Sequence, residues 1–164
     1  MPVAPEKCRM HGQLLVGLAA SLLNIAVHAI IMAPMSSSAY HMLRRAQSAH
    51  PRLRLALVMM ATVTVLMMAH LIEIGIWALV YTVLEATPKR IDAFYFAFVN
   101  YTTLGYGDIL PVDDWRILGP ITAMNGVLLF GWSTAVIFHV LSKVVGPIMP
   151  QEESERGGKG VKPM

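Results

Sequence analysis

The stretch YTTLGYGDIL, residues 101–110, is polar and rich in glycine, whereas most of the 164-residue chain is apolar. A turn needs only one or two such residues, so ten consecutive positions require another explanation. Hydrophobic residues make up 55% of the chain, charged residues make up 14%, and the mean hydropathy is +0.56. This composition, with the apolar residues gathered in long blocks, is typical of a membrane protein and excludes an ordinary soluble domain.

Three apolar blocks exceed the roughly 20 residues that a helix needs to cross a bilayer. A fourth block is shorter and reaches only about halfway across at roughly 1.5 Å per residue, which predicts a re-entrant half-helix. The predicted elements are a first transmembrane helix over 13–34, an outer helix over 55–84, the half-helix over 92–102, the Gly-rich loop over 103–107 and an inner helix over 115–143. The expected fold class is therefore an all-α integral membrane protein with three transmembrane helices, a re-entrant helix and a loop.

The placement of arginines predicts the orientation in the membrane. Four arginines lie within residues 35–54, and the positive-inside rule puts this basic loop in the cytoplasm. The N-terminal segment 1–12 is then extracytoplasmic, the short tail 144–164 is cytoplasmic and disordered, and the Gly-rich loop dips in from the outer face. A cleaved signal peptide over residues 1–35 is the alternative, and it would invert this orientation.

Irregular backbone at membrane depth survives only where it is buried in protein or lines a path filled with water. Glycines permit positive φ values, so successive carbonyls of the loop can point the same way. A ring of such carbonyls can replace the hydration shell of a cation. The C-terminal, negative end of the half-helix dipole points to the membrane centre and favours a cation there. These features predict a cation-selective pore.

The stretch DAFYFAFVNYTTLGYGDI, followed by PVDDW and an apolar helix that contains glycine, resembles the pore module of potassium channels. The resemblance covers residues 55–143 and identifies the half-helix as a pore helix and the loop as a selectivity filter. It implies that K⁺ is the permeant ion and that no organic cofactor is needed. The carbonyls of four filter residues would bind K⁺, the Thr103 hydroxyl would complete the innermost site, and Gly107 would shape the outer end. The four residues are Thr103, Leu104, Gly105 and Tyr106.

A closed ring of carbonyls needs several copies of a chain that contains one such loop, so the protein is expected to oligomerise about the pore axis. The resemblance sets the number at four, a homotetramer in membrane lipid. Neither nucleic acid nor a small-molecule substrate is expected as a partner, and the protein is not expected to be an enzyme. The expected location is the plasma membrane, of the bacterial inner-membrane type.

Further roles follow from the resemblance. Tyr95 is expected to hydrogen-bond toward Asp108, and Asn100 is the candidate partner for the hydroxyl of Tyr106, because Phe96 has no polar atom to offer. The outer-mouth carboxylates Asp108 and Asp113 should concentrate cations. Asp114 is expected either to join them or to be the N-cap of the inner helix.

One face of the inner helix is expected to line the cavity and gate below the filter. Its residues are Val127, Phe130, Thr134, Phe138 and Leu141. Gly126 aligns with the hinge glycine of the family, and the sequence leaves open whether it permits bending or only close helix contact.

Ionisable residues also lie inside the predicted spans. His70 and Glu73 are spaced i, i+3, and Glu73 is expected to pair with His70 or with polar groups behind the filter. Asn24 belongs to a polar stripe with Ser21 and His28 on the first helix, and it is a candidate partner for His70. The stripe and the pair are interpreted as structural, because one His and one Glu fall short of the His-Glu-x-x-His pattern of metalloproteases.

The sequence favours a subunit of a potassium-selective channel for passive K⁺ transport. A non-selective cation channel and a non-conducting accessory or scaffold subunit are the alternatives. No Arg-rich voltage-sensing helix is found in the first span, and the gating stimulus stays open, with His139 near the inner mouth as a candidate pH sensor.

Overall fold

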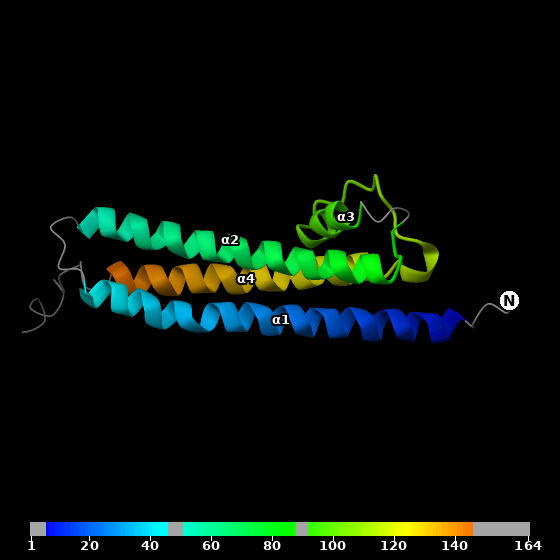
Figure 1. The fold of residues 1–164 in the computed structure, drawn as a ribbon, viewed down its shortest axis with the longest axis horizontal. Coiled ribbons are helices and arrows are strands. Elements are labelled where there is room, and N and C mark those ends of the chain that lie inside the picture. The colour runs from blue at the N-terminus through cyan, green and yellow to red at the C-terminus, as the bar shows by residue number, and fades with distance from the viewer. Residues whose placement is uncertain (1–5, 46–50, 88–91, 146–164) are drawn as a thin grey trace, which may run out of the picture.

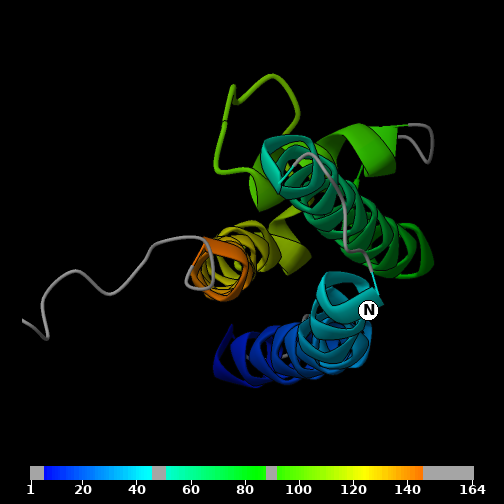
Figure 2. The ribbon, with the colours of Figure 1, turned by 90° about the vertical axis from the view of Figure 1, so that its left-hand side faces the viewer.

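The structure is a computed structural model that describes residues 6–45, 51–87 and 92–145. Three long helices lie side by side as a bundle (Figures 1 and 2), and a short helix packs against one end of it. In chain order the elements are α1 (Glu6–Arg45), α2 (Pro51–Val83), α3 (Asp92–Tyr101), the 3₁₀ turn η1 (Asp113–Trp115) and α4 (Leu118–Val145). The described ranges contain no strand, so the predicted all-α fold class is confirmed.

Each of the three long helices contains a segment that is apolar enough and long enough to cross a membrane. The spans are Met10–Pro34, Leu55–Val83 and Asp113–Lys143. Only 28% of the most apolar window of each span is buried within the chain. The remaining apolar surface needs lipid or other protein around it, because water does not solvate it favourably. The chain is therefore a multi-pass membrane protein.

Helix α1 is longer than the sequence predicts. The prediction of 13–34 matches the apolar part, whereas the helix begins at Glu6 and continues past Pro34 to Arg45. Much of the predicted extracytoplasmic segment 1–12 and basic loop 35–54 is thus helical. Hydropathy marks where a helix leaves the hydrocarbon, but backbone hydrogen bonding continues for as long as the flanking polar residues tolerate helical φ and ψ values.

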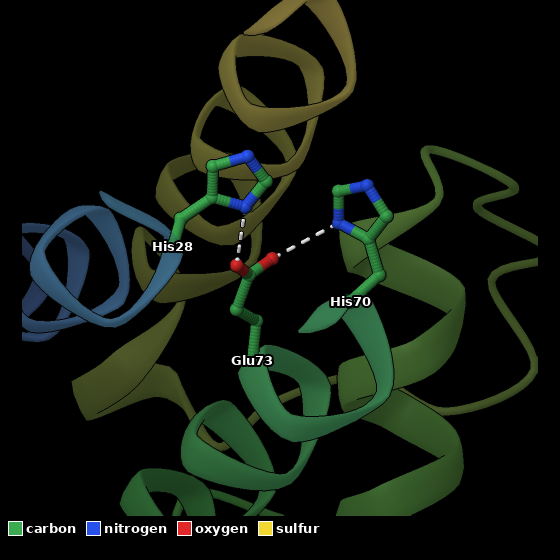
Figure 3. A group of neighbouring side chains, drawn as sticks. All are labelled: His28, His70 and Glu73. Atoms are coloured by element: carbon green, nitrogen blue, oxygen red, sulfur yellow. Dashed lines mark hydrogen bonds and ion pairs between the residues drawn. The ribbon is translucent and has the colours of Figure 1, made fainter. Parts of the chain in front are cut away.

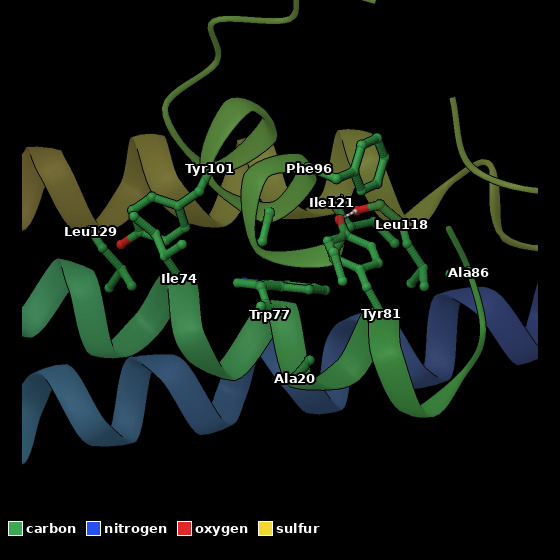
Figure 4. Packing of buried hydrophobic residues seen from close by; sticks show 13 residues of the cluster. Ala20, Ile74, Trp77, Tyr81, Ala86, Phe96, Tyr101, Leu118, Ile121 and Leu129 are labelled. Carbon is green, nitrogen blue, oxygen red and sulfur yellow. Dashed lines mark hydrogen bonds between the residues drawn. The ribbon is translucent and has the colours of Figure 1, made fainter. Parts of the chain in front are cut away.

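Helix α3 is held by a buried apolar cluster at its end of the bundle (Figure 4). Trp77 and Tyr81 of α2 are fully buried beneath α3, and the Tyr81 ring meets Phe96 edge-on with ring centroids 4.9 Å apart. The Tyr81 hydroxyl is hydrogen-bonded to Thr122 Oγ1 on α4 at 2.5 Å. These contacts fix a ten-residue helix, too short to be stable alone, against both neighbouring helices.

Candidate functional site

Helix α3 ends in a capping motif that begins the Gly-rich loop. The Thr103 amide donates to Asn100 O and the Leu104 amide donates to Val99 O, both at 2.9 Å. Thr103 lies in the left-handed region with φ = 60°. This is the Schellman motif, in which glycine is the usual left-handed residue. A threonine there costs about 1–2 kcal/mol, and such retained strain points to a role for its side chain.

Left-handed backbone recurs at every second residue of the loop. The φ values are 60° at Thr103, 57° at Gly105 and 74° at Gly107. Successive carbonyls of an ordinary strand point to opposite sides. A change in the sign of φ at every second residue rotates every second peptide plane, so that successive carbonyls point to the same side. Glycine supplies this conformation without steric cost. The loop therefore has the backbone pattern that a row of aligned carbonyls requires.

The outer end of the loop is tied back to the start of α3. The Tyr95 hydroxyl donates to Asp108 Oδ2 at 2.8 Å, so the predicted hydrogen bond is present. The bond raises the pKa of Tyr95, since the neutral phenol is the donor and the carboxylate disfavours a second negative charge beside it. Asp108 Oδ1 also accepts the Ile109 amide at 3.1 Å. These two hydrogen bonds, one to each carboxylate oxygen, fix the orientation of the Asp108 side chain.

Asn100 does not have its predicted partner within the described residues. Its Nδ2 donates to Phe96 O at 2.8 Å instead of meeting the Tyr106 hydroxyl. The reason is local, because a short polar side chain on a helix readily reaches the carbonyl one turn back. Its Oδ1 faces α4, only 3.0 Å from where a Cβ on Gly119 would lie. Asn100 therefore lies at the contact between α3 and α4.

Gly126 lies where α4 passes the last residue of α3. A Cβ on Gly126 would lie 2.0 Å from Tyr101 O and 2.9 Å from the carbonyl carbon of Tyr101. No side chain fits in this space. Of the two roles left open for Gly126, the structure contains the close contact, which sets the C-terminal end of α3 directly against α4.

The predicted cavity and gate residues are all exposed on α4. They are Val127, Phe130, Thr134, Phe138 and Leu141. Phe130 also packs with its ring against Tyr101, with centroids 5.5 Å apart. The described residues of the chain leave this face uncovered, so it can contact water or another subunit.

At the outer mouth, Asp113 is exposed and lies 3.7 Å from Arg116 in a weak ion pair. The prediction of Asp114 as N-cap of the inner helix is wrong. Asp114 lies inside η1, whose N-cap is Val112, and α4 begins only at Leu118. A 3₁₀ turn intervenes between the loop and the helix, so the capping position is displaced along the chain.

A buried polar network lies beside the last residue of α3, and Glu73 of α2 is its centre (Figure 3). One carboxylate oxygen is bonded to His28 Nδ1 of α1 at 2.7 Å, and the other to His70 Nδ1 at 3.0 Å. The Tyr101 hydroxyl of α3 donates a short hydrogen bond to the second oxygen. His70 Nε2 is bonded to Ser133 Oγ of α4 at 2.9 Å. The predicted Glu73–His70 pair is present, and the network joins all four α-helices.

A second polar group continues the network toward the N-terminal end of α1. Asn24 Nδ2 donates to Asn125 Oδ1 at 3.1 Å, and the Trp77 indole donates to the same oxygen at 3.1 Å. The prediction that Asn24 meets His70 is wrong. One turn further along α1, His28 reaches the Glu73 carboxylate, while Asn24 faces α4.

The sequence reasoning missed several residues that the structure brings into this network. They are Trp77, Tyr101, Asn125 and Ser133. Polar residues at mid-span were the available signal, since Asn125 and Ser133 lie in an otherwise apolar helix. Nothing in the sequence showed which helices these side chains would face.

Comparison with known proteins agrees with this architecture. Residues 69–143 match the family model described as "Ion channel". The chain is also similar to two-pore potassium channel 4 of Arabidopsis thaliana, with 41% identity over 58 residues. That stretch is 34% of this chain and 20% of the plant protein, so the match spans a fifth of the relative's length. No solved structure matches the chain significantly.

The chain is thus a multi-pass membrane protein that is similar to ion channels over residues 69–143. This match covers less than half of the chain, and it agrees with the resemblance of residues 55–143 to the pore module of potassium channels.

Proposed function

We propose that the chain is one subunit of a homotetrameric, potassium-selective channel that mediates passive K⁺ transport. The backbone of the loop carries this proposal, because left-handed φ values at Thr103, Gly105 and Gly107 suit a row of carbonyls that face one side. Carbonyls of residues 103–106 then bind dehydrated K⁺, and the Thr103 hydroxyl completes the innermost site. The strained threonine at the helix cap is explained by this use of its side chain.

The exposure of the loop supports assembly with other copies. Leu104 is 52% exposed and Tyr106 is 67% exposed, although both are large and apolar or aromatic. A filter that packs so little on its own chain needs neighbours on its other sides. Four copies around one axis close the ring of carbonyls, with the exposed face of α4 turned toward that axis.

The remaining roles follow from this arrangement. Asp108 and Asp113 attract cations to the outer mouth, and the exposed α4 face lines the cavity down to a constriction at Phe138 or Leu141. Gly126 serves as the contact point of α3, and Tyr95 steadies the outer end of the filter. The proposed location is the plasma membrane, with the filter opening outward and the C-terminus in the cytoplasm.

Ion flux through purified protein in liposomes tests the proposal. We expect K⁺ efflux to exceed Na⁺ efflux by a large factor and Gly105→Ala to abolish it, since Gly105 has φ = 57° and alanine disfavours that backbone. Gly75→Ala is the matched control, because no atom outside the helix's own backbone lies within 4 Å of the added Cβ. Equal Na⁺ and K⁺ flux would indicate a non-selective channel, and absence of flux would indicate an accessory subunit.

A further inference from the structure

The buried cluster of His28, His70 and Glu73 has the donor atoms of a transition-metal site. Its ligand atoms all lie within 4.8 Å of one another. Figure 3 shows both imidazoles directed at the same carboxylate, one from α1 and one from the preceding turn of α2. The Nδ1 atoms lie 2.7 Å and 3.0 Å from the two carboxylate oxygens. A small contraction or rotation of these side chains suffices to place all of them around one ion at about 2.0–2.2 Å.

We propose that this cluster binds a divalent transition metal of the Zn²⁺ type, with His28 Nδ1, His70 Nδ1 and the Glu73 carboxylate as ligands and the Tyr101 oxygen as the fourth. Two imidazole nitrogens and one carboxylate are a donor set typical of zinc and its neighbours. K⁺, Mg²⁺ and Ca²⁺ prefer sites made only of oxygen, so the permeant ion is not the expected occupant.

The charges of the ligands suit such an ion at this depth. His28 and Glu73 are fully buried and His70 is 7% exposed. Glu73 contributes one negative charge, which partly offsets the charge of a divalent ion and lowers the cost of holding that ion in an apolar surrounding.

The second ring nitrogen of His70 supports the same assignment. A histidine that binds metal through Nδ1 has its proton on Nε2, where a second partner normally accepts it. His70 Nε2 lies 2.9 Å from Ser133 Oγ, which can accept that proton. His28 Nε2 is buried without a hydrogen-bond partner among the described residues, and the His28 ring lies against Trp132 with centroids 5.2 Å apart.

The ion would join the first helix to the filter. His28 is the only ligand from α1, and Tyr101 is the last residue of α3 before the filter loop. Metal binding would therefore tie α1, α2 and α3 together at the inner end of the filter. The assignment rests on the geometry of the cluster and does not depend on whether the pore conducts.

Binding of Co²⁺, a spectroscopic substitute for Zn²⁺, tests the proposal on the purified full chain in detergent after treatment with a chelator. The measurements use the Cys8→Ser background, which removes the only thiol. We expect one Co²⁺ per chain with the visible absorption of a four-coordinate site, displaced by Zn²⁺. We also expect Zn²⁺ to raise the midpoint of thermal unfolding, since it binds the folded state only.

Variants decide which residues hold the ion. Loss of a group that merely orients a ligand costs about 10–100-fold in metal affinity, so we expect Ser133→Ala to weaken Co²⁺ binding by that factor and His28→Gln to weaken it more. His139→Gln, an exposed histidine outside the cluster, is the matched control and should bind normally. Absence of Co²⁺ absorption in the parent protein, or unchanged binding in a folded His28→Gln variant, would overturn the proposal.

X-ray absorption of the Zn²⁺-loaded parent protein keeps the test decisive if His28→Gln does not fold. The spectrum should show four nitrogen or oxygen ligands around the zinc, and two of these ligands should be imidazoles. A shell of oxygen atoms alone would refute the assignment. Liposome flux is recorded separately, so a chain that binds metal but does not conduct would refute only the proposed channel function.

Discussion

Substitution of Gly126 by alanine should damage the filter from behind. The added Cβ would lie 2.0 Å from Tyr101 O and 2.9 Å from its carbonyl carbon. Cβ atoms need at least about 3 Å to their neighbours, so either α4 or the end of α3 must move by about 1 Å. The atoms in the way belong to the backbone and cannot rotate aside as a side chain would.

The energetic cost follows from this rigidity. Insertion of a methyl group into a packed site usually costs about 1–3 kcal/mol. We expect Gly126→Ala to fall at the upper end, about 3 kcal/mol, because the carbonyl it displaces belongs to the residue whose hydroxyl is bonded to Glu73. The filter amides are tied to the same turn of α3, since Leu104 and Gly105 donate to Val99 O. A shift of Tyr101 therefore also moves the filter, and K⁺ flux should fall strongly.

Thermal or chemical unfolding in detergent and K⁺ flux in liposomes provide the two measurements. Gly75→Ala in α2 adds the same methyl group where no atom outside the helix's own backbone lies within 4 Å. Alanine is favoured over glycine in helices by up to about 1 kcal/mol, so this control should keep or slightly raise stability and should conduct normally. If Gly126→Ala matches Gly75→Ala in both measurements, the contact between α3 and α4 is looser than the distances from Gly126 to Tyr101 indicate.

Three other substitutions have defined outcomes. Tyr95→Phe removes the hydrogen bond to Asp108 and should slightly lower the midpoint of thermal unfolding, with faster loss of flux over time. Since the bond raises the pKa of the phenol, its contribution persists through neutral pH and disappears as the pH rises through that raised pKa, where the unfolding curves of both proteins should converge. Glu73→Gln removes the carboxylate that His28 and His70 contact and should cost about 1–3 kcal/mol in thermal unfolding with chelator present, and an unchanged midpoint would argue against these buried hydrogen bonds. Trp77→Phe takes one donor from Asn125 Oδ1 and should cost about 1–3 kcal/mol by the same assay, whereas an unchanged midpoint would mean that the bond is not formed.

The membrane fold was predictable because it depends on features that are local in sequence. Long apolar runs specify spans whatever their neighbours are, since the bilayer demands backbone bonds within each segment. The short block before the Gly-rich loop specified α3 by its length alone, and the bond from Tyr95 to Asp108 joins residues only 13 positions apart. Helix ends were less predictable. Helix α1 extends to Arg45 because hydrogen bonding continues where the hydropathy signal stops.

The partners of buried polar side chains were only partly predictable. Glu73 and His70 lie on one helix, so their pairing followed from i, i+3 spacing. Asn24 and His28 lie on one stripe of α1, and which of them meets Glu73 depends on how far α1 is shifted along α2. Apolar surfaces permit several such shifts at similar energy, so the spacing along one helix does not choose among them.

The sequence by itself determined the class of this protein. The three spans and the half-helix follow from hydropathy and length, and the loop TLGYGD follows from the backbone freedom of its glycines. Each segment has these properties on its own. Tertiary structure alone decided that Gly126 adjoins Tyr101 O, and that His28, His70 and Glu73 meet behind the filter. Those contacts join residues up to 45 positions apart on different helices, and their formation depends on the packing angle and depth of whole helices, which no single segment encodes.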